Sequence, residues 1–193
     1  MAALARHRRR GAIVLALLVA TLAVGALQLP SLSDMSDRGV GIVEFELSRT
    51  TAKAAEHYRD LGGSARDAAR TSLYLDYPYL ALYGLFFAAA CVVVAARGRE
   101  RGMPRLAAVG RLLAVGALIG AACDAVENAA LLRVLAGHTD QPWPGTAFGF
   151  ATVKFALSTA AGVFAVAGFV LTARRRTGEP PGRAPPAPSP PSR

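Results

Sequence analysis

The chain contains 193 residues, of which 53% are hydrophobic and only 18% are charged, and its mean hydropathy is +0.34. Soluble proteins carry about 25% charged residues, and a soluble chain of this length cannot hide so much apolar surface. The composition therefore excludes an ordinary cytosolic enzyme, a disulfide-rich secreted module and a disordered chain. It indicates an integral membrane protein.

Four apolar segments are long enough to cross a bilayer as helices, which requires about 20 residues each. The predicted spans are residues 12–29, 77–96, 106–135 and 147–173. Lipid offers backbone groups no hydrogen-bond partner, so each span should be helical. Gly98 and Gly137 follow the second and third segments, and Pro142 precedes the fourth, as expected of helix ends. The predicted fold is an all-α, four-helix transmembrane bundle that forms a membrane domain over residues 12–173.

The first apolar segment also has features of a signal peptide, because the basic residues from Arg6 to Arg10 precede it. Its apolar run is longer than a signal h-region of about 7–15 residues. Gly25 and Ala26 form a poor cleavage site. We therefore expect the segment to remain as a membrane anchor.

Basic residues gather in three places: the arm 1–11, the connection between spans two and three, and the tail 174–193. The positive-inside rule places these segments, and hence both termini, in the cytoplasm. Arginine far outnumbers lysine, which hints at a GC-rich bacterial genome and therefore at a bacterial inner membrane. The expected neighbours of the basic residues are anionic membrane lipids rather than nucleic acid, because no base-reading face accompanies them. The proline-rich tail is expected to be disordered.

Residues 31–74 form the longer of the two predicted outer loops. Residues 41–47 alternate in a way that fits a strand, but their spacing favours a short helix. A second helix is expected to start at Thr50 or the next residue. A capping-box pattern at Ser64 predicts a third helix that runs into span two and bends near Pro78. These pieces predict a helical extracytoplasmic cap between spans one and two. A solvated loop that packs on nothing is the alternative.

Ionisable and amide side chains inside the third span are the most informative feature of the sequence. Asp124, Glu127 and Asn128 are spaced i, i+3, i+4, so they share one helical face. The same face continues as Gly120 and Gly116, a G-x-x-x-G pair that permits close helix approach. A carboxylate that faces lipid costs at least roughly 2.5 kcal/mol, so this face should point into the bundle.

The second and fourth spans offer matching polar positions near the same membrane depth. Lys154 can reach inward to Glu127 or extend outward to water, and the spacing leaves both directions open. The candidate ligand-binding cluster comprises Asp76, Tyr79, Tyr83, Asp124, Glu127, Asn128, Lys154 and Ser158.

Several functions fit such a cluster. It can bind a lipid or another amphiphile, or it can contact a partner subunit or a second copy of the chain. Alternatively, Asp124 or Glu127 can act as the acid/base of a membrane-embedded enzyme on a lipid-like substrate. The cluster can also be a purely structural polar clamp, or conduct ions or protons. The sequence does not decide whether the protein is an enzyme.

The cysteines and histidines show no spacing typical of a metal site or a redox pair. Cys91 and Cys123 are expected to differ in membrane depth by roughly 9 Å, too far for a disulfide. His7, His57 and His138 lie apart from one another, outside the apolar segments. We expect neither a bound metal nor a cofactor.

Four short motifs resemble those of a family of uncharacterised four-span bacterial membrane proteins. They are Gly41-Ile-Val-Glu-Phe-Glu-Leu47, Leu75-Asp-Tyr-Pro78, Cys123-Asp-Ala-Val-Glu-Asn128 followed by Leu131-Leu-Arg133, and Val153-Lys-Phe155. The resemblance covers roughly residues 25–173. It implies the four-span plan and the same polar positions, and it implies no activity or substrate.

Overall fold

The computed structural model describes residues 2–30, 50–60 and 62–174. The predicted helix at 41–47 lies outside these residues, as does the tail beyond residue 174. The described residues form helices α1 (Ala2–Ala26), α4 (Thr51–Asp60), α5 (Gly62–Glu100), α6 (Pro104–Leu135) and α7 (Trp143–Arg174). No strand occurs among them, which confirms the all-α prediction.

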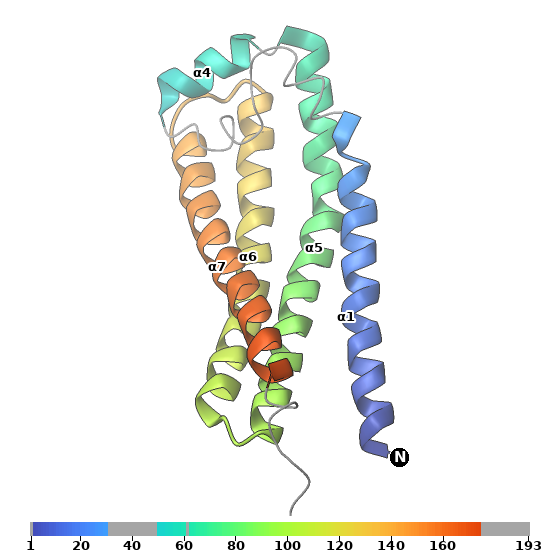
Figure 1. The fold of residues 1–193 in the computed structure, drawn as a ribbon. Helices are drawn as coiled ribbons and strands as arrows, with labels where there is room; N and C mark the ends of the chain where they lie inside the picture. The colour runs from blue at the N-terminus through green and yellow to red at the C-terminus, as the bar shows by residue number, and fades with distance from the viewer. Residues whose placement is uncertain (1, 31–49, 61, 175–193) are drawn as a thin grey trace, which may run out of the picture.

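The long helices α1, α5, α6 and α7 run side by side as a bundle (Figure 1). Helix α6 packs against both α5 and α7, whereas α1 packs chiefly against α5. Within the described part of the chain, these four helices are long and apolar enough to cross a membrane. Large apolar side chains cover the outside of the bundle, including Leu22, Leu112 and Val166. Such a surface suits contact with lipid and suggests a multi-pass membrane protein.

Helix α5 is longer at both ends than the predicted second span. It starts at Gly62, two residues before Ser64, and continues through Pro78 without interruption. Gly98, expected to end the helix, lies inside it. The chain instead reverses at Gly102, whose φ of +67° is a conformation that favours glycine. The expectation at Gly98 was wrong because the absence of a Cβ atom permits a close contact there, with Leu106 and Ala107 of α6.

Glycines set the spacing between neighbouring helices in the bundle. A Cβ atom added at Gly84 of α5 would lie 2.7 Å from the Cβ of Ala121 on α6. On the other side of α6, a Cβ atom added at Gly120 would lie 3.4 Å from the Cβ of Leu157 and 3.5 Å from the Oγ of Ser158. The predicted G-x-x-x-G face therefore packs against α7.

Helix α4 lies across the end of the bundle where α5 begins, α6 ends and α7 begins (Figure 1). Its first backbone groups are capped as predicted, because the Lys53 N–H donates to Thr50 Oγ1 at 3.3 Å. Ala54 is fully buried and packs in one apolar cluster with Ala65, Leu131 and residues nearby. The segment is thus a packed cap at this end of the molecule rather than a loop that packs on nothing.

Candidate functional site

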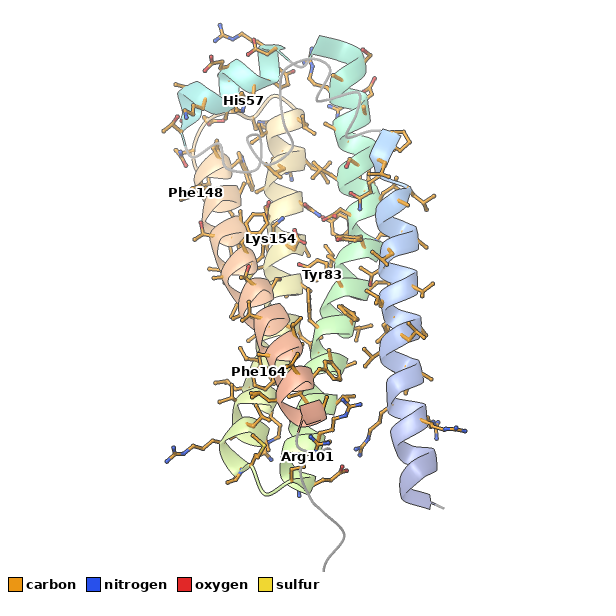
Figure 2. The ribbon with its side chains drawn as sticks, in the orientation of Figure 1. His57, Tyr83, Arg101, Phe148, Lys154 and Phe164 are labelled. Atoms are coloured by element: carbon orange, nitrogen blue, oxygen red, sulfur yellow. The ribbon has the colours of Figure 1, made fainter. Side chains whose placement is uncertain are left out.

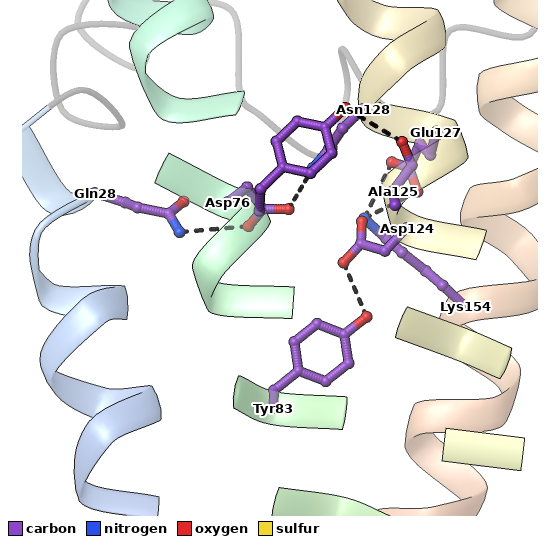
Figure 3. A network of polar contacts seen from close by, with 9 residues as sticks. Gln28, Asp76, Tyr83, Asp124, Ala125, Glu127, Asn128 and Lys154 are labelled. Atoms are coloured by element: carbon purple, nitrogen blue, oxygen red, sulfur yellow. Dashed lines mark hydrogen bonds and ion pairs between the residues drawn. The ribbon is translucent and has the colours of Figure 1, made fainter. Parts of the chain in front are cut away.

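Polar side chains of α5, α6 and α7 meet inside the bundle together with Gln28, which lies just after α1, toward the end that α4 covers (Figures 2 and 3). We call this set the polar network: Gln28, Asp76, Tyr83, Asp124, Glu127, Asn128 and Lys154.

Helix α6 directs its polar face into the bundle, as the spacing predicted. Asp124, Glu127 and Asn128 are only 3%, 0% and 1% exposed. The helix on either side of this face is apolar, so packing against α5 and α7 buries the polar side chains rather than turning them to lipid.

Lys154 of α7 points inward and bridges the two acids of α6. Its Nζ lies 2.8 Å from Asp124 Oδ1 and 3.0 Å and 2.9 Å from the two carboxylate oxygens of Glu127. The side chain is only 9% exposed. The structure therefore decides the direction that the sequence left open. A shared ammonium offsets part of the cost of burying two carboxylates, because opposite charges attract strongly where water is scarce.

Tyrosine hydroxyls of α5 tie this helix to α6. Tyr83 donates its hydroxyl proton to Asp124 Oδ2 at 2.8 Å, so both oxygens of Asp124 accept a hydrogen bond (Figure 3). Tyr77 donates to the backbone carbonyl of Ala125 at 3.4 Å. Hydrogen bonds to charged groups contribute more than neutral ones, so the Tyr83 contact should hold Asp124 in place.

Asp76 of α5 is held by neutral amides. Asn128 Nδ2 donates to its Oδ2 at 2.7 Å, and Nε2 of Gln28, which lies in the turn just after α1, donates to its Oδ1 at 3.3 Å (Figure 3). Ser72 Oγ in turn donates to Gln28 Oε1 at 3.5 Å. Among the described residues, no Lys or Arg forms an ion pair with Asp76. The network thus gathers three carboxyl groups, two of which share the ammonium of Lys154.

A cavity of about 450 Å³ lies beside the network, lined by all four long helices. We call it the interhelical cavity. Its polar lining residues are Thr21, Asp76, Tyr79, Tyr83, Asp124, Lys154 and Ser158, and its apolar lining residues are Leu18, Phe86, Phe87 and Phe155. This volume falls in the range of about 300–1,000 Å³ that is typical of small-molecule sites.

The predicted site residues fall into two groups. Six of them line the interhelical cavity, namely Asp76, Tyr79, Tyr83, Asp124, Lys154 and Ser158. Glu127 and Asn128 do not line it; instead they hold Lys154 and Asp76, respectively. Tyr79 also packs toward α1, where its ring lies 3.1 Å from the position of a Cβ added at Gly25.

Sequence reasoning missed the contribution of the first helix. Gln28 is 8% exposed and Thr21 is 6% exposed, yet both lie in a segment that reads as a plain apolar anchor. The amide of Gln28 within an apolar segment was the feature that could have identified this residue. Thr21 was harder to identify, because its hydroxyl finds a hydrogen-bond acceptor in its own helix, the carbonyl of Leu17.

The described residues contain no group of three or more His, Cys, Asp or Glu side chains arranged to hold a metal ion. Cys91 and Cys123 are buried and free, so they form no disulfide with each other. The chemistry available at the site is therefore that of carboxyl, ammonium, hydroxyl and amide groups.

No family model, curated protein or solved structure matches this chain.

Proposed function

We propose that the protein is an integral membrane protein that binds a lipid or a similar amphiphile in the interhelical cavity. The observation that carries this proposal is the mixed lining of the cavity. Asp76, Asp124 and Lys154 contribute charged groups, and Phe86 and Phe87 contribute apolar surface. A molecule with one polar end and one apolar end can use both kinds of lining at once.

The position of Phe155 suggests how such a molecule enters. This side chain lines the cavity and is also 43% exposed on the outside of the bundle. Leu18 and Thr21 line the cavity from α1, which packs chiefly against α5 and makes little contact with α7. The proposed entrance therefore lies between α1 and α7 and opens sideways, toward the acyl chains of the surrounding lipid.

The proposed setting is a bacterial inner membrane, with both termini in the cytoplasm and α4 on the outer side. The distribution of basic residues along the chain supports this orientation. The resemblance to four-span bacterial membrane proteins agrees with it. Membrane lipids would then supply the amphiphile directly.

Native mass spectrometry of protein extracted in a mild detergent tests the proposal. The wild-type protein should retain a lipid-sized mass. Leu18→Trp should lose this mass, because Leu18 lines the cavity and the larger ring would fill part of it. Leu22→Trp is the matched control, since Leu22 lies one turn along α1, is 64% exposed and does not line the cavity. This variant should retain the bound molecule.

Four results would argue against the proposed function. Wild-type protein with nothing bound, or equal retention by the two tryptophan variants, would argue for a structural clamp. A retained protein subunit would favour a partner contact at this face. Turnover of a lipid-like substrate, lost in both Asp124→Asn and Glu127→Gln while the fold persists, would favour the enzyme alternative.

A further inference from the structure

We propose that the interhelical cavity selects an amphiphile whose polar end is a positively charged nitrogen. This inference rests on the proposed function, because it names the chemical class of the molecule that the cavity binds. It is carried by the balance of charge around the cavity and by the partners of Asp76.

The charges that line the cavity are unequal. Asp76 and Asp124 present carboxylates, and Lys154 presents an ammonium. The Lys154 charge is shared between Asp124 and a second acid, Glu127, which lies behind it at 2.9–3.0 Å. With these groups ionised, the cavity wall and the acid behind it carry an excess of negative charge.

Asp76 is where a cation would be received. Its two oxygens accept hydrogen bonds from the neutral amides of Asn128 and Gln28, which orient the carboxylate without neutralising it. Amide donors hold the side chain in place, and the lining position leaves its charge facing the cavity. Asp76 is partly buried, and a carboxylate that is partly removed from water and has no ion-pair partner is costly, so a bound cation gains from pairing with it.

The same argument disfavours other polar ends. A phosphate or carboxylate group would meet two carboxylates on the wall, and its attraction to Lys154 is reduced because that ammonium is already shared by two acids. A neutral hydroxyl can accept or donate hydrogen bonds but leaves the excess charge unbalanced. Only a cation offsets it.

Aromatic rings on the wall suit the same ligand. Tyr79 and Tyr83 lie with ring centroids 5.5 Å apart, and both line the cavity. Ring faces attract ammonium groups, including quaternary ammonium groups that cannot donate hydrogen bonds. The aromatic side chains therefore stabilise a cationic nitrogen beside Asp76, while Phe86 and Phe87 contact its apolar chain.

Three probes with the same alkyl chain test this inference: dodecyltrimethylammonium, dodecanol and dodecyl sulfate. Radiolabelled forms are bound to the full-length protein in nanodiscs of an uncharged galactolipid, and binding to empty nanodiscs is subtracted. The cationic probe should bind about tenfold more tightly than the alcohol, a difference of roughly 1.4 kcal/mol. The sulfate should bind most weakly of the three.

Two aspartate variants locate the selectivity. Asp76→Asn removes one charge from the wall and should reduce the preference for the cationic probe to about threefold or less, because a neutral amide no longer attracts the cation. Asp67→Asn is the same chemical change on α5, at a side chain that is 77% exposed and outside the cavity. It should leave the tenfold preference intact.

The outcomes separate this inference from the proposed function. If the alcohol or the sulfate binds wild-type protein as tightly as the cation, the selectivity is wrong while the amphiphile site stands. If none of the probes binds above empty nanodiscs, the proposed function itself fails. If Asp76→Asn keeps the full preference, Asp76 is not the receiving group and the inference is overturned. Comparing the three probes on wild-type protein tests the preference for a cation even if a variant does not fold.

Discussion

At the scale of single residues, Lys154 holds together two acids that would otherwise repel each other. Lys154→Met leaves Asp124 and Glu127 buried beside one another without their shared cation. Removing one partner of a buried ion pair costs about 3–5 kcal/mol. We therefore expect a large decrease in the thermal unfolding temperature of the purified protein in detergent.

The chain offers a matched control for this variant, because its other lysine, Lys53, is exposed on α4. Lys53→Met should leave the unfolding temperature almost unchanged. Adding Glu127→Gln to Lys154→Met should restore part of the lost stability, since it removes one of the two buried carboxylate charges that Lys154 no longer offsets. If Lys154→Met is as stable as Lys53→Met, the bridge contributes nothing and the polar network must be held by other contacts.

The residues of the network differ in how far the sequence could predict them. Asp124, Glu127 and Asn128 stand out because charges and amides are rare in apolar helices and their spacing defines a face. The direction of Lys154 could not be predicted, since a long flexible side chain reaches either water or the bundle interior. Gln28 was missed because its partner, Asp76, lies 48 residues away on another helix, and no local pattern joins them.

At the scale of helices, Gly84 fixes how closely α5 approaches α6. An alanine there would bring two Cβ atoms within 2.7 Å, which the helices can relieve only by moving apart. We expect Gly84→Ala to destabilise the protein by about 1–3 kcal/mol, the usual cost of overpacking. Thermal unfolding in detergent measures this loss. Because Tyr83 is the adjacent residue, the same variant should weaken retention of the bound amphiphile.

Two further variants show whether the effect comes from crowding. Ala121→Gly removes the opposing methyl group, so the double variant Gly84→Ala, Ala121→Gly should recover much of the stability of the wild type. Gly149→Ala places a methyl group on α7 where nothing lies within 4 Å, so it should be neutral or slightly stabilising. Equal destabilisation by Gly84→Ala and Gly149→Ala, or no recovery in the double variant, would contradict the close-packing explanation.

The helices themselves were more predictable than their ends. Apolar runs and helix-stop residues indicate where a span is needed, because the thickness of the bilayer sets its length. They do not show which glycine turns the chain: Gly98 packs inside α5, whereas Gly102 adopts the positive φ of the turn. That difference depends on the neighbouring helix, and the sequence around either glycine does not contain it.

At the scale of the whole molecule, the long-range neighbours of each helix were beyond sequence reasoning. The predicted polar faces of the second, third and fourth spans do meet, because each had to find polar partners inside the bundle. The role of α1 could not be foreseen, since an apolar segment with few polar side chains fits against any apolar face. Its place beside α5 is what brings Gln28 to Asp76 and Leu18 to the cavity.

The two ends of the bundle differ in charge, and this difference predicts how the molecule lies in the membrane. Helix α4 packs at one end, and the turn between α5 and α6 lies at the other (Figure 1). Basic residues gather around that turn, namely Arg97, Arg99, Arg101 and Arg105. From the positive-inside rule we therefore predict that the turn lies in the cytoplasm and that α4 lies on the outer side of the membrane.

Cysteine labelling in intact cells tests this orientation at two exposed positions. Lys53→Cys on α4 should react with a membrane-impermeant maleimide in intact cells. Arg99→Cys should react only after the membrane is permeabilised. The native Cys91 and Cys123 are buried, so the wild-type protein provides a low background in both conditions. The reverse labelling pattern would show that the molecule has the opposite orientation, with the polar network near the cytoplasm. Labelling of both positions in intact cells would contradict a membrane-spanning α5.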